Sequence, residues 1–234
     1  MLSTWYLVVR GDEPDLARLG ELCASSTECS LAQEQPGEWR LRSSIIGPAI
    51  AHEAAWPMLC ELLVRLSDVA AAAAYQRVRL TPGLLGRTRP DGQSDVFVHP
   101  GAGRIRARGV PPTISTGGTP TEPVQAQLLR LQETDDHLRL ALHFLNADLS
   151  WFNLWKAFEA IRAANHGWQT LVANGWTQKT ELDRFRKTAN TYSAVGDAAR
   201  HALLGVTAPP NPMTQEDADE FVRGLLFRWV ASHS

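Results

Sequence analysis

Residues 151–165 read WFNLWKAFEAIRAAN and have the clearest periodicity in the chain. Apolar side chains recur there at positions i, i+3, i+4, i+7 and i+10: Trp151, Leu154, Trp155, Phe158 and Ile161. This spacing places them on one face of an α-helix that packs against a core. We therefore predict an amphipathic helix over this segment. We interpret its aromatic residues as core side chains, not as a cofactor site.

The sequence on either side has the same helical period. Further helices are predicted over residues 124–132, 137–146 and 180–190. A last helix should begin after Thr214, because Thr214 and Asp217 have the spacing of a capping box and follow Pro212. Together these segments indicate an all-helical bundle domain over residues 124–234.

The first 110 residues mix strand and helix patterns. Apolar or alternating runs predict strands over residues 5–10, Glu38–Ser43, 75–80, 95–99 and 104–108. Helical spacing predicts helices over residues 12–25 and His52–Ala74. We predict an α+β fold class: a small domain over residues 1–110 with one sheet and helices on one of its faces, followed by the helical bundle. Residues 111–123, rich in Pro, Gly and Thr, are predicted to link them.

The overall composition restricts the function. Lys and Arg number 23 and Asp and Glu 25, so the net charge is −2 and attraction to nucleic acid or membrane would need a local patch. No apolar tract approaches the ~20 residues of a membrane span. The N-terminal residues predict a first strand, not a signal peptide. Cys23, Cys29 and Cys60 lack metal-type spacing, so we expect buried or idle thiols in a reducing cytoplasm, with no metal and no cofactor.

Arginines alternate along two of the predicted strands. They are Arg77 and Arg79 in the first strand and Arg104, Arg106 and Arg108 in the second. Each set shares one face of its strand, and Arg87 and Arg89 are expected in the loop between. If the strands are neighbours, like charges destabilise the sheet unless an acidic group lies over them. Three interpretations remain open: a solvated face, carboxylates of this protein or another subunit, or RNA or another phosphate ligand.

A second polar group lies after the central helix. Its candidate catalytic residues are Arg184, Asn190, Arg200 and His201. A turn over residues 190–196 is predicted to bring the last three together. Histidine transfers a proton near neutral pH, and arginine stabilises the charge on a phosphorane, so the set suits phosphodiester cleavage. In the structural alternative, Arg200 pairs with Asp197 and His201 satisfies a backbone carbonyl.

Several segments of the last 90 residues or so carry a resemblance. SWFNLWKAFEAIRAANHG (residues 150–167), RFRKTAN (184–190), GDAARH (196–201) and the Thr-capped last helix resemble a group of bacterial proteins, some of which are associated with mobile elements or defence genes. This region is also similar to HEPN domains, helical bundles that dimerise and often act as metal-independent ribonucleases. Their signature is an arginine followed by a histidine after four to six residues. Arg130 and His137 have that gap, whereas Arg200 and His201 are adjacent.

Two functions follow as expectations. The first is a bacterial binding or assembly module that self-associates through the helical domain as a homo-oligomer and contacts an acidic partner, either RNA or protein, without a membrane. The second is a HEPN-like, metal-independent ribonuclease. The first is favoured because the sequence has no nucleophile elbow, paired-histidine metal motif or paired catalytic carboxylates.

Overall fold

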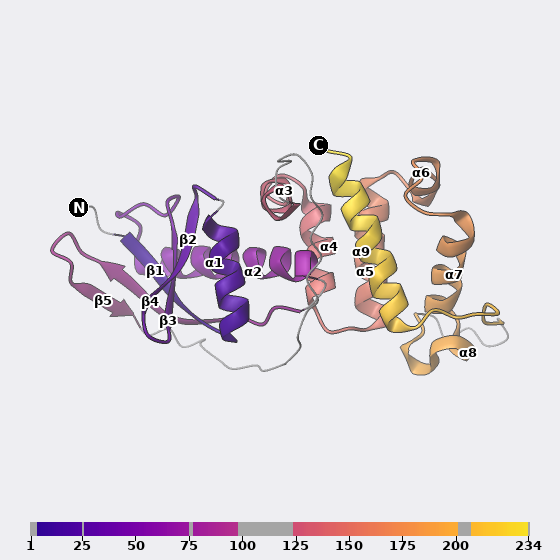
Figure 1. Ribbon diagram of the computed structural model, residues 1–234, viewed down its shortest axis with the longest axis horizontal. Helices are drawn as coiled ribbons and strands as arrows, with labels where there is room; N and C mark the ends of the chain where they lie inside the picture. The colour runs from indigo at the N-terminus through magenta and orange to yellow at the C-terminus, as the bar shows by residue number, and fades with distance from the viewer. Residues whose placement is uncertain (1–3, 25, 75–76, 98–123, 201–206, 234) are drawn as a thin grey trace. The chain divides into compact units, whose positions relative to one another are not determined.

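The computed structural model describes residues 4–24, 26–74, 77–97, 124–200 and 207–233 (Figure 1). The chain combines an antiparallel sheet with helices and divides into two compact units, Met1–Leu129 and Arg130–Ser234. The predicted linker over residues 111–123 lies outside the described residues, so the predicted domain boundaries stay a prediction. Within the described ranges, no helix is long and apolar enough to cross a membrane.

The first unit contains a sheet of five strands in the order β2-β3-β1-β4-β5, with every neighbouring pair antiparallel. The strands are β1 (Thr4–Arg10), β2 (Cys29–Gln35), β3 (Glu38–Ser43), β4 (Thr81–Thr88) and β5 (Ser94–Phe97). Leu7 in the central strand pairs with Leu41 of β3 and Leu85 of β4, and all three are buried. This row of leucines forms the middle of the core.

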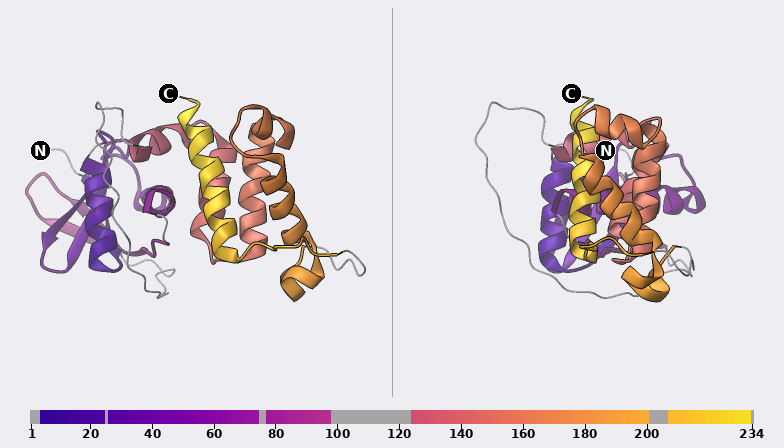
Figure 2. Two further views of the ribbon diagram at one scale, coloured as in Figure 1. Left: turned by 45° about the vertical axis from the view of Figure 1, so that its right-hand side comes forward. Right: turned by 90° about the vertical axis from the view of Figure 1, so that its right-hand side faces the viewer.

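Two helices, α1 (Glu13–Ala24) and α2 (His52–Ala74), lie on the same face of the sheet (Figure 2). Glu13 of α1 accepts a hydrogen bond from the Trp39 indole of β3 at 3.3 Å, and His52 of α2 stacks on Phe97 of β5 with ring centroids 4.8 Å apart. Gly20 lets α1 approach the sheet, because a Cβ there would lie 3.0 Å from the Leu31 carbonyl oxygen.

The predicted strand over residues 75–80 is wrong in its described part, because residues 77–80 belong to no strand. The strand β4 follows immediately and contains Pro82, Gly83 and Gly86, which are weak strand formers. The glycines are required by packing: a Cβ at Gly83 would lie 2.9 Å from the Val8 carbonyl oxygen, and one at Gly86 would overlap the Tyr6 ring. The predicted strand over residues 104–108 lies outside the described residues.

Within the described residues of the second unit, every secondary-structure element is helical, and turns and loops connect these elements. The helices from residue 124 onward are α3 (Val124–Leu131), α4 (Asp136–Asn146), α5 (Trp151–Ala164), α6 (Trp168–Ala173), α7 (Lys179–Asn190), α8 (Tyr192–Val195), the 3₁₀ turn η1 (Gly196–Ala198) and α9 (Gln215–Ala231). In Figures 1 and 2, α5 lies beside α4 and α9. The capping box is confirmed: Thr214 Oγ1 accepts from the Asp217 N–H at 3.0 Å, and Asp217 accepts from the Thr214 N–H at 3.3 Å.

The core of this unit is organised around Phe185 of α7. Its ring lies 5.3 Å from Phe158 and 5.9 Å from Trp155 of α5, and 5.2 Å from Phe221 of α9, measured between centroids. Aromatic pairs at these separations add ~0.5–1.5 kcal/mol each beyond the area that they bury. The core interpretation of Trp151, Trp155 and Phe158 is confirmed, since all three are buried.

Candidate functional site

The best-defined polar cluster of the helical unit joins Arg200 to α5. The Arg200 Nη2 atom lies 3.1 Å from Glu159 Oε1, and its guanidinium carbon lies 4.6 Å from the centroid of the Trp155 ring. Lys156 Nζ binds the other oxygen of the same carboxylate at 3.1 Å. Two cations therefore share one anion, and the cluster keeps a net positive charge.

An exposed aromatic ring extends this cluster. Phe152, Lys156 and Glu159 lie at i, i+4 and i+7 of α5, so they share one face of the helix. Phe152 is 63% exposed, the largest value among the large hydrophobic residues in the described ranges. Lys156 Nζ lies 5.8 Å from the centroid of its ring. We call Phe152, Lys156, Glu159 and Arg200 the α5 cluster.

The turn after α7 positions Arg200. The helix α8 and the turn η1 reverse the chain, with Gly196 in the left-handed region at φ 59°. The Arg200 N–H then donates to the Ala189 carbonyl oxygen in the last turn of α7, at 3.0 Å. Asp197, the partner expected for Arg200 in the structural alternative, instead accepts a hydrogen bond from the Tyr192 hydroxyl at 3.2 Å.

The carboxylate of Glu159 holds the α5 cluster together as an anion. Burial raises its pKa, but the Trp155 indole N–H and the Lys156 ammonium beside it, together with the charge of Arg200, outweigh burial and lower the pKa below its ordinary value. Glu159 therefore stays ionised at neutral pH. It suits the role of an anchor for Lys156 and Arg200, not that of a general acid.

The three candidate catalytic residues that the structure describes, Arg184, Asn190 and Arg200, do not form one site. Asn190 and Arg200 lie at the same end of α7, where Asn190 Nδ2 donates to the Arg186 carbonyl at 2.6 Å. Arg184 instead donates to the Asn211 carbonyl at 2.6 Å and forms an ion pair with Asp217 at 3.6 Å. It therefore links α7 to the segment before α9 and to the first turn of α9. His201 lies outside the described residues. The Asn190 Oδ1 atom is buried and has no hydrogen-bond partner in the described part of the chain.

The arginines predicted to line two strands are also arranged differently. Arg87 lies within β4, not in a loop, and shares the Asp95 carboxylate with Arg89. The hydrogen bond from Arg89 is the main cause that lowers the pKa of Asp95 to about 2. Arg77 and Arg79 are half-buried and precede β4 outside any strand. The remaining positions, Arg104, Arg106 and Arg108, lie outside the described residues.

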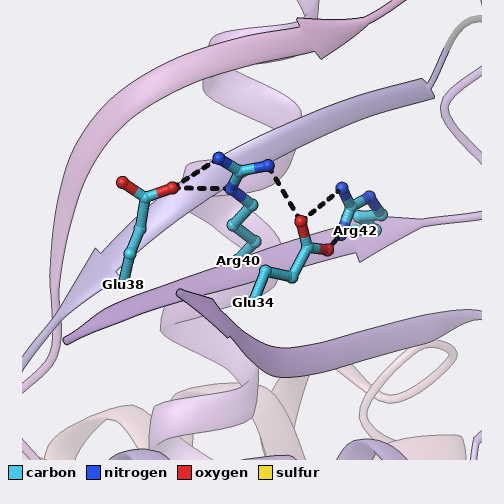
Figure 3. Close-up of polar contacts among 4 residues, drawn as sticks. All are labelled: Glu34, Glu38, Arg40 and Arg42. Atoms are coloured by element: carbon cyan, nitrogen blue, oxygen red, sulfur yellow. Dashed lines mark hydrogen bonds and ion pairs between the residues drawn. The ribbon is translucent and has the colours of Figure 1, made fainter. Parts of the chain in front are cut away.

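A second arginine group, which the sequence analysis missed, lies on the sheet (Figure 3). Arg40 of β3 binds Glu34 of β2 at 2.8 Å and Glu38 at 2.6 Å, while Arg42 binds Glu34 as well. Both guanidinium groups cover the Tyr6 ring, at 4.3 and 5.3 Å from its centroid. The alternation of Glu38, Arg40 and Arg42 in the sequence indicates that these three side chains share one face of β3. The pairing of β2 with β3 is needed to identify Glu34 as the partner of both arginines. Here the acidic groups over the arginines are the protein's own carboxylates.

No group of three or more His, Cys, Asp or Glu side chains is placed to hold a metal ion within the described ranges. No protein-family model, curated protein or solved structure significantly matches this chain.

Proposed function

We propose that this protein is a binding and assembly module whose helical domain contacts an acidic partner, RNA, and self-associates. The observation that carries the proposal is the α5 cluster, in which the exposed ring of Phe152 lies beside Lys156, one of two cations that share the Glu159 carboxylate. The proposal retains the two-domain organisation, with an α+β domain over residues 1–110, a linker over 111–123 and a helical bundle over 124–234. It also retains a bacterial, cytoplasmic setting.

The cluster has the elements that single-stranded RNA requires. Lys156 and Arg200 supply charge for phosphates, and Phe152 offers a ring on which a base stacks, worth ~1–3 kcal/mol per base. The arginines Arg40 and Arg42 on the sheet are less suitable, because carboxylates of the same sheet already neutralise them. The proposal therefore places the contact on α5.

Fluorescence anisotropy with an end-labelled single-stranded RNA tests this contact. Phe152→Ala and Lys156→Gln should each weaken binding about tenfold, or ~1.4 kcal/mol. Lys187→Gln, which removes the same charge from an exposed position of α7, should leave it unchanged. Two neutralised phosphates should give a slope of about −1.4 in a plot of log affinity against log salt.

Polyglutamate serves as the competing acidic probe in the same assay. Binding of polyglutamate without binding of RNA would assign the surface to an acidic protein partner. The contact on α5 would be wrong if neither probe bound, or if Lys187→Gln lost as much affinity as Lys156→Gln.

Self-association is the second part of the proposal. Leu140 of α4 is 47% exposed, and a large apolar side chain at the surface is available for contact with a second copy of the chain. Light scattering at micromolar concentration should give a mass above the 25.8 kDa of one chain. A monomeric mass would contradict this part and leave the RNA contact to its own test.

The metal-independent ribonuclease remains the alternative function. One observation favours it: the turn after α7 brings Arg200 to the end of the helix that carries Asn190. Total RNA is incubated with the protein in chelator, and wild type is compared with Arg200→Ala and His201→Ala. Absence of cleavage, or equal cleavage by all three proteins, would remove this alternative.

A further inference from the structure

Two of the three cysteines meet at the junction between α1 and β2. Cys23 lies in the last turn of α1 and Cys29 begins β2, and a hydrogen bond joins their sulfur atoms at 3.5 Å. A disulfide bond is about 2.05 Å long, so the two atoms need to approach by only about 1.5 Å to form one. The fold therefore places the thiols close to bonding distance although the two cysteines are six positions apart in sequence.

The two thiols differ in access and acidity. Cys23 is buried, whereas Cys29 is half-buried and reaches solvent. The hydrogen bond with Cys23 is the main cause that lowers the pKa of Cys29 to about 7. Burial and the charge of Glu28 oppose that shift, while Ser26 and the charge of Arg65 assist it. The same hydrogen bond and burial raise the pKa of Cys23. Cys29 is thus the nucleophile of the pair, because the thiolate is the reactive form.

We propose that Cys23 and Cys29 form a reversible dithiol–disulfide pair that is oxidised by low-molecular-weight disulfides. In the first step the Cys29 thiolate attacks one sulfur of the disulfide RSSR, whose S–S bond breaks and releases RS⁻, which takes up a proton. In the second step Cys23 loses its proton and attacks the Cys29 sulfur of the mixed disulfide, releasing the second RSH. The pair gives two electrons to RSSR, and the products are one protein disulfide and two RSH.

The bond would covalently close the α1–β2 junction. It would tie the C-terminal end of α1, whose Leu22 is buried, to the first residue of an edge strand. A disulfide of this kind in a reducing compartment is a redox-sensing group and not a permanent crosslink. The proposal does not depend on the RNA contact of the α5 cluster, since no residue is shared.

The full-length reduced protein is incubated with glutathione disulfide, quenched with acid and alkylated, and its intact mass gives the number of remaining thiols. We expect the three thiols of the chain to fall to one, with a peptide map that joins Cys23 to Cys29. Cys60, half-buried in α2 with its pKa raised by burial, should stay reduced. Cys60→Ser is the matched control and should form the same bond.

Single cysteine variants test the two steps of the oxidation separately. Cys23→Ser should stop at a mixed disulfide on Cys29, whereas Cys29→Ser should react at least tenfold more slowly, because only the buried thiol remains. The wild-type equilibrium is also compared in buffer and in urea. Oxidation should go further in the folded protein, because a bond that fits the native structure stabilises it. Three free thiols after incubation, a link through Cys60, or equal oxidation in urea would overturn the proposal.

Discussion

The guanidinium group of Arg223 is buried and donates a hydrogen bond to the main-chain carbonyl of Leu145 at 2.9 Å. Its Nε atom also donates to Asp219 one turn earlier in α9, at 2.8 Å. The buried Arg223 charge thus has a carboxylate and a carbonyl as partners, and its hydrogen bonds link α9 to the end of α4. Removing one member leaves the others desolvated and uncompensated.

Replacing Arg223 should therefore destabilise the protein strongly. For Arg223→Ala we expect the free energy of unfolding to fall by about 3 kcal/mol, measured by urea denaturation. Arg228→Ala is the control on the same helix: Arg228 is exposed and bonds the Trp176 carbonyl, so its loss should cost under about 1 kcal/mol. An equal loss of unfolding free energy in the two variants would contradict the stabilising role of the buried Arg223 contacts.

The close packing of Tyr6 on Gly86 gives a second prediction. A methyl group at residue 86 would overlap the Tyr6 ring, which is itself only 2% exposed and held under Arg40 and Arg42. Gly86→Ala should lower the free energy of unfolding by about 1–3 kcal/mol, as overpacking does. Gly47→Ala is the control, because a Cβ at that position would meet no atom within 4 Å. Chemical denaturation measures the unfolding free energy of both variants. A similar loss in Gly47→Ala would indicate a general effect of alanine and not the overlap with Tyr6.

The acidity of Cys29 predicts how its reactivity depends on pH. With a pKa of about 7, half of Cys29 is thiolate at neutral pH, so its alkylation by iodoacetamide should be half-maximal near pH 7. In Cys23→Ser the curve should move toward the ordinary value of 9.0, because the largest cause of the shift is lost. Mass spectrometry of the alkylated peptides measures both curves. Cys60, whose pKa is raised, should react only at higher pH and provides an internal reference.

Asp95 makes stability depend on acid pH. Its pKa is about 2 in the folded protein against 3.8 ordinarily, chiefly through the hydrogen bond from Arg89. Because the pKa of Asp95 is lower in the folded protein, its carboxylate contributes its full stabilisation at pH values above 3.8. This contribution is lost as the pH falls through about 2. The urea midpoint of Asp95→Asn should thus lie below that of wild type at neutral pH, and the two should converge near pH 2.

Asp91→Asn is the control for this titration. Asp91 accepts a hydrogen bond from the Gln93 N–H at 3.0 Å, and an asparagine oxygen at that position makes the same contact. Its midpoint should follow that of wild type at every pH. If the urea midpoint of Asp95→Asn stayed below that of wild type by the same amount down to pH 2, the loss of stability at residue 95 would be steric and not electrostatic.

Local periodicity in the sequence determined much of the helical structure. The stripe from Trp151 to Ile161 predicted α5 within one residue, and the Thr214–Asp217 pattern predicted the start of α9. Glu38–Ser43 and His52–Ala74 were predicted with the bounds that the structure has. These elements follow from sequence because their apolar spacing and end groups act between residues a few positions apart.

The edge of the sheet was harder to predict for a physical reason. β2 buries only Leu31, so its sequence lacks the alternation that marks a half-buried strand. β4 carries Pro82 and two glycines that sequence reasoning takes as turn residues, and their place in a strand depends on what packs against them. Both strands exist because the neighbouring strands supply their hydrogen bonds.

The sequence by itself determined the longer helices, many of the residues that form their core and the net charge of −2, but it did not predict the short helices α6 and α8. Only the tertiary structure decided which polar groups far apart in the sequence meet. Glu159 and Arg200 are 41 residues apart, and the Arg184 contact with Asn211 spans 27. Contacts of this kind depend on how helices and strands pack against one another, and no local spacing encodes that geometry. The two cysteines meet for the same reason: the packing of α1 on β2 brings their sulfur atoms together.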